Sequence, residues 1–435
     1  MPDIDGTPLV WLSFDSEGRL GDNPKPLHAL HEAMQRVQAT DVLVLSHGWK
    51  NTQAQAARLY QAIWRNARPH IPSSRRFVLA GIAWPSVAFP TDFDDRAGRE
   101  TAGGALAAPL AGGPSDLDPR TFERILRQSL PGKENARLRS LARAAASDPS
   151  AETKAALAAE LARRMQALAA GDDAELSDEA ELIARRANSN PELLFQISAK
   201  PFVPRDGEDG GAAGGEGAGQ VVRGPLASIA RLANQFTYYP MKRRAGKVGR
   251  MLGGYLDPQP FLANTRLHLA GHSFGGRLVT ACASQMKSLR PQSLTLLQAA
   301  FSHNGLAASS PAGPGYFADV LAEQRVRGPI AITHTHNDRA CTFYYALASR
   351  LAGDGTMAIG DANDRYGAMG ANGAQHVDAL RHGGFPPSSG HRPVAGRVNN
   401  YLADKVVVAV PGGTDAHNNI GNAGIGALLG SIVSL

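Results

Sequence analysis

Arg266-Leu-His-Leu-Ala-Gly-His-Ser-Phe-Gly-Gly-Arg277 is the stretch around which the rest of the chain is organised. Its apolar run from Leu267 to Ala270 predicts a buried strand. Residues 277–286 carry apolar side chains at helical spacing and predict a helix. A Gly-x-Ser-x-Gly turn centred on Ser273 lies between them. In this strand–turn–helix context the motif typically exposes a nucleophilic serine at the end of a strand.

Two glycines explain how so sharp a turn could form. We expect the residues two before and two after Ser273 to crowd each other, and glycine at 271 and 275 removes the Cβ atoms that would clash. The amide of Phe274, at the start of the helix, would then point at an oxyanion forming beside Ser273. Because the chain contains 47 glycines, a glycine-rich turn without chemistry stays open as the alternative.

Composition limits the class of protein. The 435 residues, 43% of them hydrophobic, suit two or three domains or one large α/β domain with insertions. The net charge of +6 slightly favours anionic surfaces. No basic run is interleaved with aromatic residues, so we expect no nucleic-acid partner. Cys282 and Cys341 are expected to be buried free thiols, because two cysteines make neither a disulfide framework nor a zinc site.

No targeting segment is recognisable. The N-terminal residues lack the basic and apolar regions of a signal peptide, and no run approaches the roughly 20 apolar residues of a membrane span. We therefore expect a soluble, cytoplasmic protein, with export by a route without a cleaved signal left open.

The first 85 residues alternate strand and helix. Strands are predicted at 8–14, 41–46 and 77–84, with helices at 26–37 and after Thr52. The run from Asp41 to Ser46 is continuously apolar after its first residue, as in a parallel strand covered on both faces. Residues 1–85 are thus predicted to be the first part of an α/β core with a mostly parallel sheet.

The remaining chain divides into an insertion and a second core segment. Residues 86–225 are predicted to be a mainly helical insertion, in which the polar, glycine-rich residues 206–220 form a disordered loop. Residues 226–435 are predicted to complete the core. Their expected elements are strands at 293–300, 329–336 and 405–410, a helix at 342–351, an irregular excursion at 353–400 and a terminal helix within 424–435.

A serine nucleophile needs a base, and the base needs an orienting acid. In a parallel sheet such residues lie at the carboxyl ends of strands. Asp338 follows the strand predicted at 329–336, and His417 lies seven residues beyond Val410. Asp338 could instead cap the next helix. The rival acids and bases are Asp361, Asp364, His376, His382 and His391.

An oxyanion hole needs a second amide, from a loop after an early strand. His47-Gly48-Trp49 is such a loop, and the amide of Trp49 is the candidate beside that of Phe274. His47, Gly48 and His272 are expected to support the turn. Packing of a strand end is the alternative role for His47 and Trp49.

Residues 334–338 offer a rival chemistry. His334 and His336 lie two residues apart and close to Asp338, a spacing that partly matches a metal-ligand set. Arg339 stands where a third histidine would be needed, so structural or substrate-facing histidines are the better interpretation. We predict no metal and no cofactor.

These residues together resemble the α/β-hydrolase superfamily, specifically bacterial lipase/esterase-like serine hydrolases. The resemblance is carried by His47-Gly48-Trp49-x-Asn51, Ala83-Trp84-Pro85-Ser86, the Ser273 motif, Asn337-Asp338 and His417, and it spans residues 8–85 and 226–435. It implies an α/β-hydrolase fold with a large helical lid or cap, an acyl-enzyme on Ser273 and no cofactor. The insertion after Trp84 departs from the pattern by its length, and a lid there implies a covered site for a bulky acyl or lipid substrate.

The expected function is therefore hydrolysis of carboxylic esters, either lipase- or phospholipase-like or as a carboxylesterase. The basic run Lys242-Arg243-Arg244 and the apolar tail favour transient contact with an anionic membrane surface, although a solvated helix face explains the basic run equally well. A bacterial effector, a non-catalytic scaffold whose insertion binds a partner, and amide or thioester hydrolysis stay open. The sequence does not determine the oligomeric state.

Overall fold

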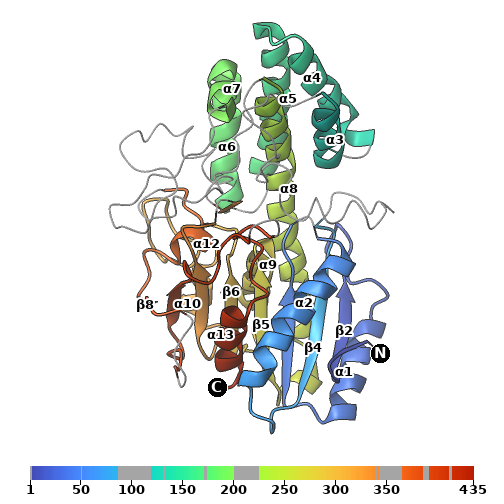
Figure 1. Cartoon of the computed structure of the whole chain (residues 1–435), viewed down its shortest axis with the longest axis vertical. Coiled ribbons are helices and arrows are strands. Elements are labelled where there is room, and N and C mark those ends of the chain that lie inside the picture. Colours follow the sequence, from blue (N-terminus) through green and yellow to red (C-terminus); the bar gives the residue numbers. More distant parts are fainter. Residues whose placement is uncertain are drawn as a thin grey trace. The chain divides into compact units, whose positions relative to one another are not determined.

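The computed structural model describes residues 2–49, 51–86, 119–130, 133–170, 174–199, 225–338, 340–341, 365–385, 391–410 and 414–435. The chain forms two compact units (Figure 1). The sheet unit comprises Met1–Pro90, Met241–Thr342 and Gly367–Leu435, and the helical unit comprises Thr91–Pro240 and Phe343–Tyr366.

A nine-stranded sheet is the centre of the sheet unit, with the strand order β1-β2-β4-β3-β5-β6-β7-β9-β8. Every neighbouring pair is parallel except β1 and β2. The predicted α/β fold with a mostly parallel sheet is confirmed. The strands are β1 Asp3–Ile4, β2 Thr7–Ser13, β3 Asp41–Ser46, β4 Phe77–Ala83, β5 Arg266–His272, β6 Ser293–Leu297, β7 Ile330–His334, β8 Ala379–His382 and β9 Val398–Leu402.

The strand β3, next to the central strand β5, fixes the register around which the site is built. All its side chains are buried, as predicted for a strand covered on both faces. It pairs with β4 on one side and β5 on the other, and Ser46 at its end lies opposite Gly271. The loop that follows β3 and the turn that follows β5 therefore leave the sheet side by side at its carboxyl edge.

Helices cover both faces of the sheet. The helices of this unit are α1 Lys25–Val37, α2 Gln53–Ala67, α9 Phe274–Gln285, α10 Ala318–Ala322, α12 Met369–Asn372 and α13 Ala423–Val433. Right-handed crossovers place α1 and α9 on one face and α2, which leads back from β3 to β4, on the other. Tyr60 and Trp64 of α2 share a buried core with Leu428 and Ile432 of α13. The terminal helix predicted within 424–435 is thereby confirmed.

The long helix α8, Pro225–Leu256, contributes residues up to Pro240 to the helical unit and residues from Met241 to the sheet unit. Two glycines one turn apart bring it against α9. A Cβ atom on Gly249 would lie 2.1 Å from the carbonyl oxygen of Leu278, and one on Gly253 would lie 2.6 Å from that of Cys282. The backbones of α8 and α9 therefore pack in direct contact.

The helical unit confirms that a helical insertion separates β4 from β5. Its further helices are α3 Pro119–Ser129, α4 Ala136–Ser147, α5 Ala151–Ala169, α6 Ala174–Ser189 and α7 Pro191–Ala199. The apolar face of α5, formed by Leu157, Leu161, Met165 and Leu168, is buried. The loop predicted as disordered at 206–220 lies outside the described residues.

Two predictions in the last quarter of the chain were wrong. The last parallel strand next to β7 is β9, at 398–402, and residues 405–410 form a turn and an irregular segment in which Val408 and Val410 are exposed. The excursion 353–400 is not irregular throughout, because it contains α12, β8 and β9. The helix predicted at 342–351 lies outside the described residues.

Polar side chains within β9 explain why this strand was not predicted from the sequence. Asn399 and Asn400 occupy its interior and are fully buried. Asn400 exchanges hydrogen bonds with the backbone of Ala374, and Asn399 bonds the backbone of Val394 and Arg397. Because every polar group finds a partner, these asparagines can replace the apolar residues by which a buried strand is usually identified.

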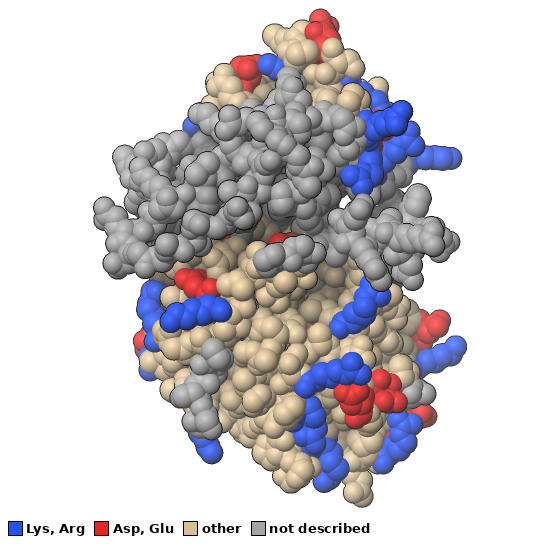
Figure 2. Space-filling view, viewed as in Figure 1, with Lys and Arg blue, Asp and Glu red and all other residues tan. Residues whose placement is uncertain are grey.

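The expected basic run does not form an exposed patch. Lys242 is fully buried, and Arg244 is partly buried and donates a hydrogen bond to the carbonyl of Pro85. On the face drawn in Figure 2, the described acidic and basic side chains of the sheet unit lie in mixed groups. Among the described helices, none combines the length and the apolar composition that crossing a membrane requires.

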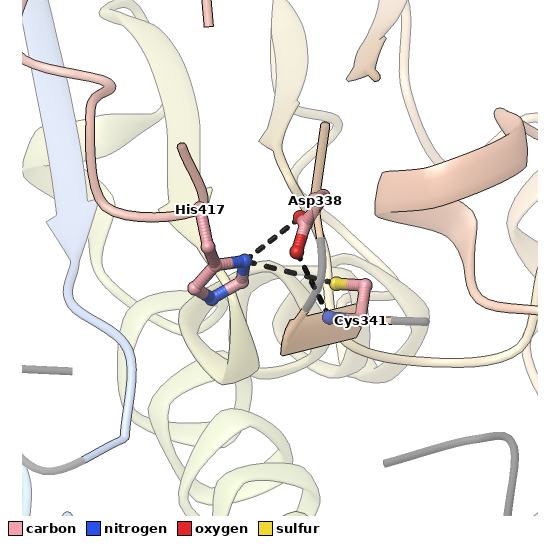
Figure 3. A group of neighbouring side chains, drawn as sticks. All are labelled: Asp338, Cys341 and His417. Carbon is pink, nitrogen blue, oxygen red and sulfur yellow. Dashed lines mark hydrogen bonds and ion pairs between the residues drawn. The ribbon is translucent and has the colours of Figure 1, made fainter. Parts of the chain in front are cut away.

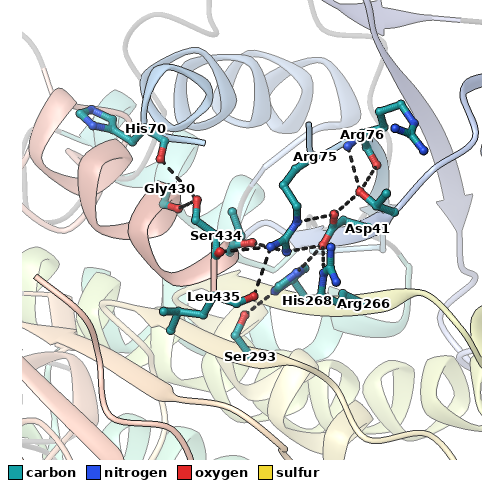
Figure 4. Close-up of polar contacts among 12 residues, drawn as sticks. Asp41, His70, Arg75, Arg76, Arg266, His268, Ser293, Gly430, Ser434 and Leu435 are labelled. Atoms are coloured by element: carbon teal, nitrogen blue, oxygen red, sulfur yellow. Dashed lines mark hydrogen bonds and ion pairs between the residues drawn. The ribbon is translucent and has the colours of Figure 1, made fainter. Parts of the chain in front are cut away.

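A buried ionic cluster closes the opposite, amino edge of the sheet (Figure 4). Asp41, at the start of β3, is fully buried and accepts two hydrogen bonds from Arg75, at 2.8 and 2.5 Å, and one from Arg266 at 3.1 Å. Arg75 also donates to the carbonyls of Val433, Ser434 and Leu435 at the end of α13. The cluster therefore links β3, β5 and the C-terminal helix.

His268 extends this cluster to β6. Its Nε2 lies 3.1 Å from Asp41 Oδ1, and its Nδ1 lies 2.8 Å from the hydroxyl of Ser293. Burial lowers the pKa of His268, so the ring is neutral, donates to Asp41 and accepts from Ser293. Burial alone would raise the pKa of Asp41, but the hydrogen bonds from His268 and Arg75 lower it below its ordinary value of 3.8.

Replacing Asp41 by asparagine should strongly destabilise the sheet unit, because Arg75 and Arg266 would lose their buried counter-charge. We expect the free energy of unfolding in urea at pH 7 to fall by about 3–5 kcal/mol. Since the pKa of Asp41 is depressed, its contribution is present above the ordinary carboxyl pKa and is lost as the pH falls through the folded-state value. The difference between wild type and Asp41→Asn should therefore shrink in acid.

Asp5→Asn is the matched control, because Asp5 also forms a bidentate pair with an arginine, Arg65, but on the surface. Its effect should be much smaller. Equal losses of stability in the two variants would contradict the structural role assigned to the buried cluster.

Candidate functional site

Ser273 occupies a strained position between β5 and α9. Its backbone has φ 57° and ψ −124°, in a region that non-glycine residues rarely adopt. Three backbone hydrogen bonds hold it there: its amide donates to Leu297, and its carbonyl accepts from Gly276 and Ala300. The residue is thus fixed to the end of β6 and to the first turn of α9.

The two flanking glycines have the predicted steric role. A Cβ atom on Gly271 would lie 2.2 Å from the carbonyl oxygen of Gly275. One on Gly275 would lie 2.3 Å from the carbonyl oxygen of Ser46, at the end of β3. The turn can therefore close only with glycine at both positions.

His417 and Asp338 form the polar pair expected beside Ser273 (Figure 3). His417 Nδ1 lies 2.8 Å from Asp338 Oδ2. Asp338 follows β7 and is fully buried, whereas His417, in the loop before α13, is 8% exposed. Because an ionised carboxylate only accepts hydrogen bonds, Nδ1 carries the proton and Nε2 of the neutral ring keeps its lone pair.

Burial and charge shift the pKa values of His417 and Asp338 in opposite directions. Burial alone would lower the pKa of His417, but the charge and hydrogen bond of Asp338 raise it above its ordinary value. Burial alone would raise the pKa of Asp338, yet the charge and hydrogen bond of His417 lower it. Asp338 therefore stays ionised and favours the protonated form of His417.

His272 connects this pair to the serine turn. Its Nε2 donates a hydrogen bond of 2.9 Å to the carbonyl oxygen of His417, and the two rings lie 4.8 Å apart. Burial lowers the pKa of His272 to about 3, so it is neutral and does not compete for protons. Because His272 precedes Ser273 in the chain, this bond holds the backbone of His417 next to the turn.

The loop after β3 approaches the same serine. A Cβ atom on Gly48 would lie 2.7 Å from Ser273 Cβ and 3.2 Å from its Oγ, so only glycine fits there. His47 donates from Nδ1 to the carbonyl of Gly48, stacks on Trp84 and has a pKa lowered by burial to about 4. The loop is thereby fixed beside Ser273.

Trp49 and Phe274, the two predicted oxyanion donors, are the residues that directly follow Gly48 and Ser273 in the chain. Phe274 is the first residue of α9, at the positive end of the helix dipole. Trp49 follows Gly48, and its ring lies 6.1 Å from that of Phe274. Asn51 donates to the carbonyls of Gly48 and Trp49, and its own backbone exchanges hydrogen bonds with Ser86. Hydrogen bonds between Asn51 and Ser86 therefore join the loop after β3 to the segment after β4.

The rival histidines are not part of this group. Asp361 and Asp364 fall outside the described residues. His376 is exposed. His382 bonds Asn399 and stacks on Tyr401, and His391 bonds the hydroxyl of Tyr401, at the β8–β9 edge of the sheet.

The possible metal ligands His334, His336 and Asp338 do not come together at one point either. His336 bonds Asp404 and is largely exposed, whereas Asp338 bonds His417. In the part of the chain that the structure describes, one group of at least three potential ligands comes together: Asp338, Cys341 and His417. Arg339 lies outside the described residues.

Cys341 is a neighbour of the polar pair that the sequence did not reveal as such. As predicted, it is buried and free, like Cys282. Its Sγ lies 3.8 Å from His417 Nδ1, and its amide donates to Asp338 Oδ1 at 2.8 Å. Burial and the nearby Asp338 raise the pKa of the thiol well above its ordinary value. The thiol therefore stays protonated and is a poor nucleophile.

Gln298 is the other neighbour that sequence reasoning missed. It follows β6, is fully buried and lies 3.4 Å from Asp338 Oδ2 through its Nε2. Its place directly after a strand was the available signal, but a glutamine side chain is neither an acid nor a base and so does not mark a catalytic pair in a sequence.

The structure thus gathers Ser273, Phe274, His272, Gly48 and Trp49 around one turn, with the pair of His417 and Asp338 joined to it through His272. Comparison of the chain with protein-family models, curated proteins and solved structures found no match. A function for this edge of the sheet therefore has to be argued from its geometry.

Proposed function

We propose that the chain is a serine hydrolase with an α/β-hydrolase fold, and that it cleaves carboxylic esters through an acyl-enzyme on Ser273. The observation that carries the proposal is the strained Ser273 turn beside a buried, hydrogen-bonded histidine–aspartate pair. Strain at a non-glycine residue is stored mainly at functional sites. Ser273, Asp338 and His417 also follow each other in the chain order of this superfamily, with the second amide supplied by the loop after β3.

In the first step, Ser273 Oγ attacks the ester carbonyl carbon while its proton passes to His417 Nε2. Asp338 keeps the ring in the required tautomer and stabilises the imidazolium that forms. The carbonyl oxygen becomes an oxyanion, which the amides of Phe274 and Trp49 stabilise. Each such donor contributes about 3 kcal/mol to the transition state.

In the second step, the tetrahedral intermediate expels the alcohol, which takes the proton from His417. Water then attacks the acyl-serine while His417 accepts its proton. Collapse of the intermediate breaks the bond to Ser273 Oγ, which takes that proton back from His417 as the carboxylic acid leaves. The residues named supply the nucleophile, the base, the orienting acid and the oxyanion donors, so the cycle requires no cofactor.

For the substrate we propose an ester with a long or bulky acyl group, as in lipase- or phospholipase-like enzymes. The support is the size of the helical insertion, which enters the chain after the carboxyl end of β4, the edge at which the site lies. Insertions at this edge commonly cover the site of such enzymes. Because Lys242 is buried, the run 242–244 does not present three positive charges to an anionic surface, and we do not propose contact with a membrane.

Labelling with a fluorophosphonate probe tests the nucleophile. Wild-type protein should carry the label on the peptide that contains Ser273, found by mass mapping, and Ser273→Ala should carry none. His417→Ala should label far more slowly, and its esterase kcat should fall by about 10⁴-fold or more.

His376→Ala is the matched control, since this histidine is exposed and was a rival base. It should label at the wild-type rate. Absence of label on folded wild-type protein, with or without detergent or lipid vesicles, would favour a non-catalytic scaffold that binds a partner. Label on a different serine would contradict the assignment of Ser273.

The pH dependence of kcat/KM tests whether Asp338 raises the pKa of His417. His417 acts as a base only when neutral, and its pKa is raised above the ordinary 6.5. Activity should therefore rise with pH through an inflection above that value. In Asp338→Asn the inflection should move to lower pH, because the charge that favours the imidazolium is gone, and the rate should fall by about 10⁴-fold.

Asp378→Asn removes a carboxylate of the exposed pair with Arg397 and changes the net charge equally. It should leave both the inflection and the rate unchanged. If the inflection of kcat/KM lay at the same pH in Asp338→Asn as in wild-type protein, the role given to Asp338 would be contradicted.

Hydrolysis of a series of p-nitrophenyl esters tests the substrate class. We expect kcat/KM to increase from acetyl to longer acyl chains, because a covered site gains free energy from each buried methylene, about 0.8 kcal/mol. A preference for the acetyl ester would indicate a small-molecule carboxylesterase. Faster cleavage of matched anilides or thioesters would replace the ester assignment.

A further inference from the structure

Gln298 holds a position from which it can control the orientation of Asp338. It follows β6 with a positive φ of 45°, and its side chain is fully buried. The strained backbone turns the side chain toward β7 and the loop that carries Asp338. Its amide contacts three groups: Thr333 of β7, Gly370 of α12 and Asp338 itself.

The contacts of Gln298 determine which end of its amide faces Asp338. Nε2 lies 2.9 Å from the carbonyl oxygen of Gly370, which can only accept. The backbone amide of Gln298 donates to the hydroxyl of Thr333, and that hydroxyl donates to Oε1 at 2.8 Å. With both ends assigned, the nitrogen is the atom that lies 3.4 Å from Asp338 Oδ2.

Donors contact both oxygens of the Asp338 carboxylate. The amide of Cys341 bonds Oδ1, whereas His417 and Gln298 both face Oδ2. A buried carboxylate has no water to satisfy its oxygens, so each donor restricts its rotation. The contact from Gln298 is longer than those from His417 and the Cys341 amide, so it adds the weakest restraint of the three.

We propose that Gln298 is a positioning residue, which holds the Asp338 carboxylate in the rotation that presents Oδ2 to His417 Nδ1. Its effect on the reaction rate rests on the proposed function. Its effect on the hydrogen bond between His417 and Asp338 does not, because that bond exists whether or not Ser273 reacts. The two effects can therefore be measured separately.

Gln298→Met is the principal variant, because methionine has a similar shape and no donor. The first measurement is the far-downfield proton NMR signal of the His417 Nδ1 proton, identified by its loss in His417→Ala. In Gln298→Met we expect this signal to shift upfield or disappear. With an ester substrate we expect kcat to fall by about 10- to 100-fold, the usual loss when a supporting partner is removed, with KM nearly unchanged.

Gln375→Met is the matched control. Gln375 is also buried and donates to a backbone carbonyl, that of Asn372, but its described contacts do not include Asp338. Its replacement should change neither the signal nor kcat. If both variants lose the signal equally, the effect is general loosening of the structure and the proposal fails.

Thr333→Val provides a second variant in case Gln298→Met does not fold, as judged by its thermal unfolding curve. It retains Gln298 but removes the hydroxyl that orients the amide, so we expect a smaller change of the signal in the same direction. An unchanged signal and unchanged kcat in folded Gln298→Met, or in Thr333→Val if the first is unfolded, would overturn the proposal. So would absence of the signal from wild-type protein.

A chain that is not a hydrolase would give a different set of results from a chain in which Gln298 has no positioning role. If wild-type protein neither labels nor hydrolyses esters, while the signal is present and changes in Gln298→Met but not in Gln375→Met, the positioning role stands. In that case only the assignment as a hydrolase is lost.

Discussion

The close approach of backbone atoms at the carboxyl ends of β3 and β5 is the constraint on which the rest of the site depends. Gly275 lies against the carbonyl of Ser46, and Gly271 lies against Gly275. With so little space, the chain can turn from strand to helix only through a positive φ at Ser273. The cost of this conformation is of the order of 1–3 kcal/mol, offset by packing and by the backbone bonds to β6. The serine is rigid as a result.

Rigidity at Ser273 extends to the polar pair through the backbone. His272 cannot move without moving β5, and it holds the carbonyl of His417. The ring of His417 is then oriented by Asp338, a carboxylate that the amide of Cys341 and the side chain of Gln298 also contact. Because these groups are buried, their mutual interactions are weakly screened. Neutral His272 adds no competing charge beside His417, so the charge of Asp338, with a smaller contribution from Asp415, favours the protonated ring.

Sequence patterns predicted the elements whose apolar residues are continuous, and failed where polar residues replace them. The run 41–46 and the motif at Ser273 were recognisable because burial on both faces and crowding by backbone leave little choice of residue. The strand β9 was missed because Asn399 and Asn400 are satisfied by distant backbone groups, which no local pattern reveals. The valines at 405–410 were misread as a strand, although two of them are exposed. Gln298 and Cys341 became visible as neighbours of Asp338 only in three dimensions.

The two edges of the sheet show why residue types alone do not define a site. Ser293, His268 and Asp41 form a hydrogen-bonded chain of the same three residue types as the proposed triad. All three are 0% exposed, Asp41 is bound by two arginines, and Ser293 lies in a regular strand. At the other edge Ser273 and His417 retain 6% and 8% exposure, the serine backbone is strained, and Asp338 lies behind His417. The first arrangement can only stabilise, because its charge is neutralised and no substrate atom can reach it. The second keeps an ionised carboxylate behind a titratable base, which is the condition for moving a proton.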